Sequence, residues 1–140
     1  MNETNEKFAY KKVMVIDDSE IDRYVAAYNI KKHHFAEEVI LKESAKGALD
    51  YLRTAANTPE DLPQLIFLDI RMPQMDGFGF LEEYQKLPDT IQKECIVMML
   101  SSSLNPEDHI RAEQNRFVSR FLDKPLDKSK LETLAQLAIL

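Results

Sequence analysis

The sequence lacks the features that mark secreted, disulfide-bonded or membrane proteins. Cys95 is its only cysteine, and it stands beside an apolar run, where a thiol is typical of a small buried hydrophobic residue. No stretch approaches the roughly 18 apolar residues of a membrane-spanning helix, and the polar N-terminus has no apolar segment for a signal peptide. We therefore expect a cytoplasmic protein that does not associate with membranes.

Basic patches and glycine-rich loops are missing as well. The 18 Lys and Arg residues are outnumbered by 24 Asp and Glu residues, and no run of basic residues opposes the formal net charge of -6. This charge repels nucleic-acid phosphates and anionic membranes, so no nucleic-acid partner is expected. The chain also has no glycine-rich phosphate-binding loop, which disfavours a nucleotide enzyme.

The chain does contain a regular alternation of short apolar runs and segments of helical period. Its 140 residues, 44% of them hydrophobic, fit one domain with a sizeable core. The apolar runs are typical of buried parallel strands and cover residues 13–16, 39–41, 65–68, 96–100 and 118–122. This alternation predicts βα units with right-handed crossovers, and therefore a doubly wound α/β sheet.

The segments between the runs carry helix signals. Ser19 is placed to cap the start of a helix. The apolar residues that follow have the spacing of a core-facing helix side, and they are Ile21, Tyr24, Val25 and Tyr28. Similar stripes occupy residues 45–56, 78–81 and 131–138. A further helix is expected over residues 105–115, which begin with Asn-Pro but contain few apolar residues. We expect this polar helix to be the most loosely anchored one.

The polar residues that follow the apolar runs are candidates for a functional site, because doubly wound sheets bind ligands at the carboxyl ends of their strands. Asp17 and Asp18 follow the first run, Asp69 the third and Ser101 the fourth, while Lys124 lies just after the fifth. Neighbouring carboxylates repel one another unless a cation compensates, and Mg²⁺ prefers oxygen ligands. We therefore predict a Mg²⁺ site beside a carboxylate that attacks phosphorus, with a hydroxyl and an ammonium group receiving phosphoryl oxygens.

The three acids differ in their sequence context. Asp69 follows a fully apolar run and precedes a turn that would fold over the site, so we assign it as the nucleophile. Asp17 and Asp18 stand side by side, as suits metal ligands. Ser101 is favoured as the hydroxyl by its position at a strand end, and Ser102 is an alternative of the same chemical type.

At these positions the chain resembles the receiver domain of bacterial two-component response regulators, the CheY-like family. The resemblance rests on four motifs in order: VMVIDD (13–18), LIFLDIRMPQMDG (65–77), MMLSSS (98–103) and FLDKP (121–125). It implies a flavodoxin-like (βα)5 fold with a five-stranded parallel sheet in the strand order 2-1-3-4-5. The receiver domain would cover residues 12–140 after a polar N-terminal extension at residues 1–11, and a stand-alone receiver is expected.

The resemblance also implies a function in phosphorelay signalling. A phosphohistidine on a sensor histidine kinase or a histidine phosphotransfer protein would donate its phosphoryl group to Asp69. Mg²⁺ would be bound by Asp17, Asp18, Asp69 and the backbone carbonyl of Arg71. No turnover enzyme activity is expected beyond autodephosphorylation.

A conformational switch is implied by the same resemblance. Lys124, followed by a cis peptide to Pro125, would bind the phosphate, while Ser101 moves toward it and Phe121 turns inward to fill the space. The surface changed by this switch would comprise the helix at 105–115, the strand at 118–122 and the last helix. It would bind an unknown downstream protein or serve a phosphate relay, with the chain as a monomer or a phosphorylation-dependent homodimer.

Two other classes of protein use similar residues. One is a pseudo-receiver, a protein-interaction module that keeps the fold without being regulated by phosphorylation. The other is a Mg²⁺-dependent phosphohydrolase, although the usual D-x-D arrangement is absent after either acid-bearing run. Two residues near the motifs are given structural roles: Gly77 is expected to adopt positive φ in a D-G turn, and His109 to be a solvated surface residue.

Overall fold

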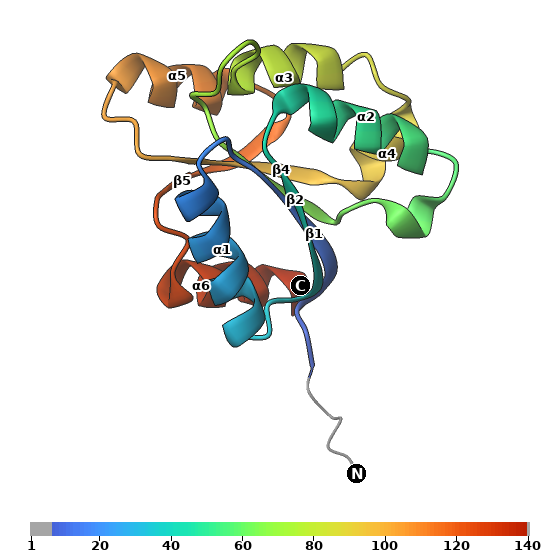
Figure 1. Ribbon diagram of the computed structural model, residues 1–140, viewed down its shortest axis with the longest axis vertical. Coiled ribbons are helices and arrows are strands. Elements are labelled where there is room, and N and C mark those ends of the chain that lie inside the picture. Colours follow the sequence, from blue (N-terminus) through green and yellow to red (C-terminus); the bar gives the residue numbers. More distant parts are fainter. Residues whose placement is uncertain (1–6, 140) are drawn as a thin grey trace.

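The computed structural model of the chain describes residues 7–139 and contains a five-stranded, fully parallel sheet in the order β2-β1-β3-β4-β5. The strands are β1 (Tyr10–Ile16), β2 (Ala36–Lys42), β3 (Leu65–Leu68), β4 (Ile96–Ser101) and β5 (Val118–Asp123). The sheet confirms the expected α/β class and strand order (Figure 1).

Helices cover both faces of this sheet (Figure 1). They are α1 (Glu20–Lys32), α2 (Ala45–Ala55), α3 (Gly77–Tyr84), α4 (Asp89–Glu94), α5 (Pro106–Gln114) and α6 (Lys128–Ile139), with a 3-10 turn at Pro59–Asp61. Helices α1 and α6 lie on one face and α2 to α5 on the other. Every helix within residues 7–139 is too short or too polar to cross a bilayer.

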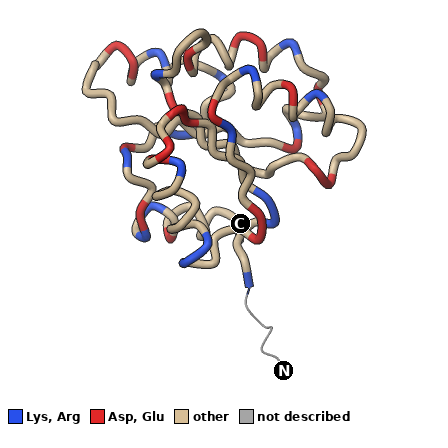
Figure 2. Tube along the Cα trace, in the orientation of Figure 1, with Lys and Arg blue, Asp and Glu red and all other residues tan. Residues whose placement is uncertain are grey.

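The central strands are apolar throughout because both of their faces are buried. In β1, Met14 and Ile16 join the core under α2 to α5, whereas Val13 and Val15 join the core under α1 and α6. Alternate side chains of a strand point to opposite faces, so a strand between two helix layers needs apolar residues at every position. Basic and acidic residues are interspersed over both helix layers (Figure 2).

Helix α1 forms where it was expected, but it turns a different side toward the core. The side chain of Ser19 accepts a hydrogen bond from the backbone N–H of Asp22, as the predicted N-cap requires. The buried residues are Ala26 and Ile30, whereas three members of the expected stripe are exposed: Ile21 (74%), Tyr24 (69%) and Tyr28 (51%). The prediction that this stripe faces the core is therefore wrong, because the side with the small Ala26 packs on the sheet instead.

The sheet begins earlier in the sequence than expected. Tyr10 pairs with Ala36 in β2, its ring packs on Phe35 at 5.1 Å between centroids, and its hydroxyl donates to the carbonyl of Leu134. Tyr10 and Lys11, assigned by the sequence to the N-terminal extension, thus belong to β1. Residues 1–6 of that extension lie outside the described residues.

Two helices in the second half of the chain differ from what the sequence predicts. The short helix α4 was not predicted, since Ile91 is its only buried residue and six residues are too few to show a period. Helix α5 begins as expected, with the side chain of Asn105 accepting a hydrogen bond from the N–H of Glu107 at 3.0 Å. Its buried positions are Ala112 and, unexpectedly, Asp108.

Candidate functional site

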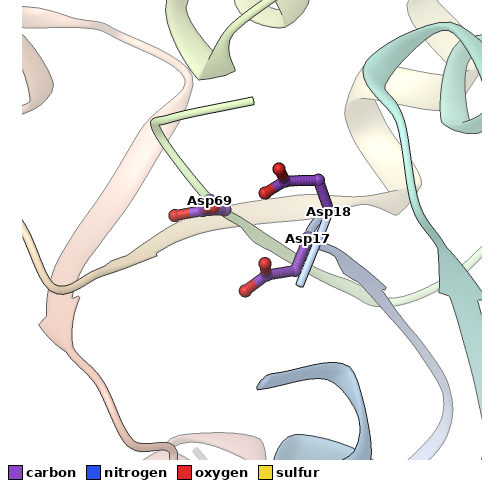
Figure 3. A group of neighbouring side chains, drawn as sticks. All are labelled: Asp17, Asp18 and Asp69. Carbon is purple, nitrogen blue, oxygen red and sulfur yellow. The ribbon is translucent and has the colours of Figure 1, made fainter. Parts of the chain in front are cut away.

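Three carboxylates meet at the carboxyl ends of β1 and β3. Asp17 and Asp18 follow β1 and Asp69 follows β3, and one oxygen of each lies within 4.8 Å of the others (Figure 3). The two strands are neighbours with Ile16 opposite Leu68, so the residues after them emerge side by side. Asp17 and Asp69 are buried, and Asp18 is exposed.

The backbone fixes the positions of the two buried acids. The N–H of Asp17 donates to the carbonyl of Lys42, and the N–H of Asp69 donates to the carbonyl of Ile16, which extends the sheet pairing past the strand ends. Each carboxylate also accepts one backbone N–H, Asp17 from Ser19 and Asp69 from Ile70, both at 2.9 Å.

Gly77 allows the loop after β3 to close against Asp69. A Cβ atom on this residue would lie 2.5 Å from the backbone oxygen of Asp69 and 3.0 Å from the side chain of Met99. The expected positive φ is absent, because Gly77 begins helix α3 and no glycine of the described residues has positive φ. Its role is close backbone approach rather than an unusual turn.

Burial and charge repulsion weaken the acidity of Asp69. Desolvation is the larger cause and the neighbouring charge of Asp17 the second, and together they raise the pKa of Asp69 to about 6, against partial compensation by Lys124. Asp69 is 7% exposed, so water screens these effects little. The carboxylate is still ionised at neutral pH. A cation at the site would reduce the free-energy cost of keeping this buried charge beside Asp17.

Lys124 lies among the acids. Its Nζ is 2.6 Å from Oδ2 of Asp17, 2.8 Å from Oδ2 of Asp22 and 3.4 Å from Oδ1 of Asp69. Burial by itself lowers the pKa of Lys124, but hydrogen bonds to Asp17 and Asp22 outweigh it and hold the pKa above its usual value. The peptide to Pro125 is cis, as the family resemblance implied.

The three consecutive serines after β4 occupy different environments. Ser101 is buried and its Oγ accepts the N–H of Ser103 at 3.0 Å, Ser102 is exposed, and the hydroxyl of Ser103 donates to Asp108 at 2.7 Å. All three line a hollow of about 500 Å³ that also includes the acids and Lys124. Ser101 as the switch hydroxyl stays a prediction.

A buried polar network that no sequence pattern predicted joins this hollow to helix α5. The Asp108 carboxylate is 3% exposed and accepts hydrogen bonds from the Arg71 guanidinium at 2.5 Å and from Ser103. The bond from Ser103, followed by that from Arg71, holds the pKa of Asp108 below its usual value. Arg71 was named for its backbone carbonyl alone, and that role stays a prediction. An acid in a polar helix carries no sequence signal of burial.

His109 was expected to be solvated, and that expectation is wrong. Its ring packs against Phe121 with 4.0 Å between centroids, and Nε2 is 3.2 Å from the carbonyl oxygen of Ser103. The residue is half-buried because α5 lies beside β5, which a helix pattern alone does not reveal. Phe121, the predicted rotameric aromatic, is half-buried under this ring.

The network around Asp108 leads to a stability prediction. Ser103→Ala should lower the free energy of unfolding by about 1.5 kcal/mol, because a buried carboxylate loses a charge-assisted hydrogen bond. Urea denaturation at pH 7 would measure the change. Ser102→Ala is the matched control, since this exposed neighbour should stay within about 0.5 kcal/mol of the original chain. Equal losses in both variants would contradict a specific role for Ser103.

Comparisons with known proteins agree with this geometry. The family model of the response regulator receiver domain matches residues 13–136. The response regulator Rcp1 from Synechocystis is 28% identical over 90% of this chain and 84% of its own length. A two-component response regulator structure from Cytophaga hutchinsonii has a TM-score of 0.84 at 28% identity, covering 92% of this chain and 96% of that one.

A third comparison concerns a structure solved with a metal. The receiver domain of the histidine kinase CKI1 from Arabidopsis thaliana, complexed with Mg²⁺, has a TM-score of 0.77 at 27% identity, covering 91% of each chain. The matched family model spans nearly all of the described residues and includes both acid-bearing strand ends. The chain therefore belongs to the response regulator receiver domain family and is a receiver domain of two-component signalling.

Proposed function

We propose that this receiver accepts a phosphoryl group on Asp69 and that this modification controls its binding to other proteins. The observation that carries the proposal is the position of the Asp69 carboxylate, buried beside Asp17 and Asp18 with the Lys124 ammonium 3.4 Å away. A nucleophile and a cationic partner for phosphoryl oxygens thus share one hollow.

The transfer is a displacement at phosphorus. A carboxylate oxygen of Asp69 attacks the phosphorus of a phosphohistidine, the bond from phosphorus to the ring nitrogen breaks, and the nitrogen keeps the electron pair. With a pKa of about 6, Asp69 is ionised at neutral pH and more basic than an ordinary carboxylate. Lys124 is close enough to compensate the charge that the phosphoryl group brings.

The three acids fit a hard divalent cation. Their oxygens lie within 4.8 Å of one another, they are the ligand type that Mg²⁺ prefers, and their mutual repulsion is reduced by a positive charge. Asp17, Asp18, Asp69 and the Arg71 carbonyl would hold Mg²⁺, which neutralises phosphoryl oxygens when bound. The Mg²⁺ complex of the CKI1 receiver domain supports this assignment.

The output would pass through the surface formed by α5, β5 and α6. Ser101 would move toward the phosphoryl group and Phe121 would turn inward. Helix α5 contacts the site directly, through Arg71 and Asp108, and it contacts Phe121 through His109. A rearrangement at the hollow therefore has a short route to this surface.

The partners follow from this chemistry. The phosphoryl donor would be a sensor histidine kinase or a histidine phosphotransfer protein, and the recipient of the signal a downstream protein or relay. The chain would act in the cytoplasm as a monomer or as a phosphorylation-dependent homodimer. It would catalyse its own phosphorylation and dephosphorylation rather than the turnover of a separate substrate.

Incubation with acetyl phosphate and Mg²⁺ tests this proposal. Intact-mass measurement should show one added phosphoryl group on the original chain and on Asp123→Ala, an exposed acid near the site, and none on Asp69→Ala. No adduct with any donor, or an adduct that persists in Asp69→Ala, would contradict the proposal. Continuous release of phosphate from acetyl phosphate that persists in Asp69→Ala would instead favour a phosphohydrolase.

A further inference from the structure

Asp22 contacts the site from helix α1. No sequence pattern predicted that this helix takes part in the site. This residue lies in the first turn of α1, and its Oδ2 is 2.8 Å from the Nζ of Lys124. Two other carboxylates, those of Asp17 and Asp69, approach the same ammonium. An ammonium group has three N–H donors, so each donor has one acid within reach.

Asp22 differs from the other two acids because it has no predicted role in binding the cation or the phosphoryl group. Asp17 and Asp69 belong to the cluster that fits a divalent cation, and Asp69 is the predicted phosphoacceptor, whereas Asp22 is not part of that cluster. When Asp17 and Asp69 bind a cation and a phosphoryl group, Asp22 would be the acid whose carboxylate contacts Lys124 alone. It is the constant partner of the ammonium.

The helix start that carries Asp22 is tied to the end of β1. The N–H of Asp22 donates to the Ser19 side chain, and Nη1 of Arg23 donates to the carbonyl oxygen of Asp17 at 2.8 Å. The side chain of Asp22 is 41% exposed, but that of Lys124 is only 13% exposed. A short side chain on an anchored helix start thus holds the end of a long and largely buried side chain.

We propose that Asp22 is a positioning residue that holds the Lys124 ammonium where it receives a phosphoryl oxygen on Asp69, an inference that rests on the function proposed above. Asp22 keeps Nζ bound between α1 and the acidic hollow, 3.4 Å from Asp69, so little side-chain freedom is lost when the phosphoryl group arrives. An ordinary first-turn acid would act only through the helix dipole, as the exposed Glu20 in the same turn does.

Beryllofluoride, a stable mimic of a phosphoryl group on a carboxylate, provides the test. With saturating Mg²⁺, calorimetric titration should show about threefold to tenfold weaker beryllofluoride binding for Asp22→Asn, since the lysine regains rotamer freedom. Glu20→Gln removes the same charge from the same turn without touching Lys124 and should bind like the original chain. Asp22→Glu should recover most of the loss. Unchanged or tighter binding by Asp22→Asn would overturn the proposal, as would an equal loss in Glu20→Gln.

A readout without metal or phosphate separates positioning from other effects. In the metal-free original chain, the ammonium of Lys124 should give a slowly exchanging ¹H–¹⁵N NMR signal, assigned by its loss in Lys124→Ala. The signal should broaden in Asp22→Asn and persist in Glu20→Gln, and its persistence in Asp22→Asn would also overturn the proposal. Failure of the original chain to bind beryllofluoride would instead count against the proposed function.

Discussion

Asp69→Asn should stabilise the metal-free protein at pH 8, raising the free energy of unfolding by about 2 to 3 kcal/mol. Burial first, and then the charge of Asp17, raise the pKa of Asp69 from 3.8 to about 6, so ionisation of this acid opposes folding. Asparagine removes the charge and keeps the size of the side chain. Urea denaturation in the presence of a metal chelator would measure the gain.

The pH dependence of this gain has a definite sign. Because the folded protein holds the Asp69 proton more tightly than the unfolded chain, the stability from this group is complete below about pH 4 and is lost as pH rises through about 6. The advantage of Asp69→Asn should therefore be small at pH 4 and full at pH 8. Asp123→Asn, which changes the exposed acid at the last position of β5, is the control and should show no such trend. A pH-independent difference for Asp69→Asn would contradict the account.

Mg²⁺ should raise the melting temperature of the original chain. A cation that binds only the folded protein adds about 2.7 kcal/mol at a concentration 100 times its dissociation constant, or roughly 5 to 10 °C for a domain of this size. The physical reason is the relief of repulsion among Asp17, Asp18 and Asp69. Differential scanning fluorimetry across millimolar MgCl₂, with NaCl at matched ionic strength, would measure it.

Asp18→Asn provides the matched variant for the metal prediction. Asp18 is the exposed member of the cluster, so its replacement should leave the metal-free fold intact while blunting the Mg²⁺-dependent rise. Asp50→Asn, an exposed acid on α2, should keep the full rise. A melting temperature that does not respond to Mg²⁺, or that rises equally in Asp18→Asn, would argue against a cation at this site.

The fold and the acidic cluster were predictable because they depend on strong local patterns. Strands with two buried faces are apolar at every position, so β1 and β3 appear as uninterrupted runs. The residues after neighbouring parallel strands must emerge together, which brought Asp17, Asp18 and Asp69 within one hollow. Lys124 joins them for the same reason, since it follows β5 at the same edge of the sheet.

The contacts between helices and the site were not predictable, because the face that a helix turns inward depends on what it packs against. In α1 the expected stripe with Tyr24 is exposed, and the Ala26 side contacts the sheet. The orientation of α1 that buries Ala26 also brings Asp22 to Lys124. In α5, Asp108 accepts a hydrogen bond from Arg71, which is distant in the sequence, and His109 meets Phe121 on the adjacent strand.

The structure therefore shows two sets of polar contacts at the hollow that contains the predicted phosphoacceptor. Asp22 links α1 to Lys124, and Arg71 and Asp108 link the loop after β3 to α5. Phosphorylation of Asp69 would add negative charge to the hollow that both sets of contacts border. A change in the contacts of Asp22 would then be transmitted to α1, and a change in the contacts of Asp108 to α5.

The central claim is that Asp69, and neither Asp17 nor Asp18, carries the phosphoryl group. Borohydride reduces an aspartyl phosphate to homoserine, so treatment of the acetyl phosphate-modified protein, followed by peptide mass mapping, identifies the modified position. The account predicts homoserine at position 69 alone, formed only when Mg²⁺ and the phosphoryl donor are both present. Homoserine at position 17 or 18, or no reduction at any acid, would contradict it.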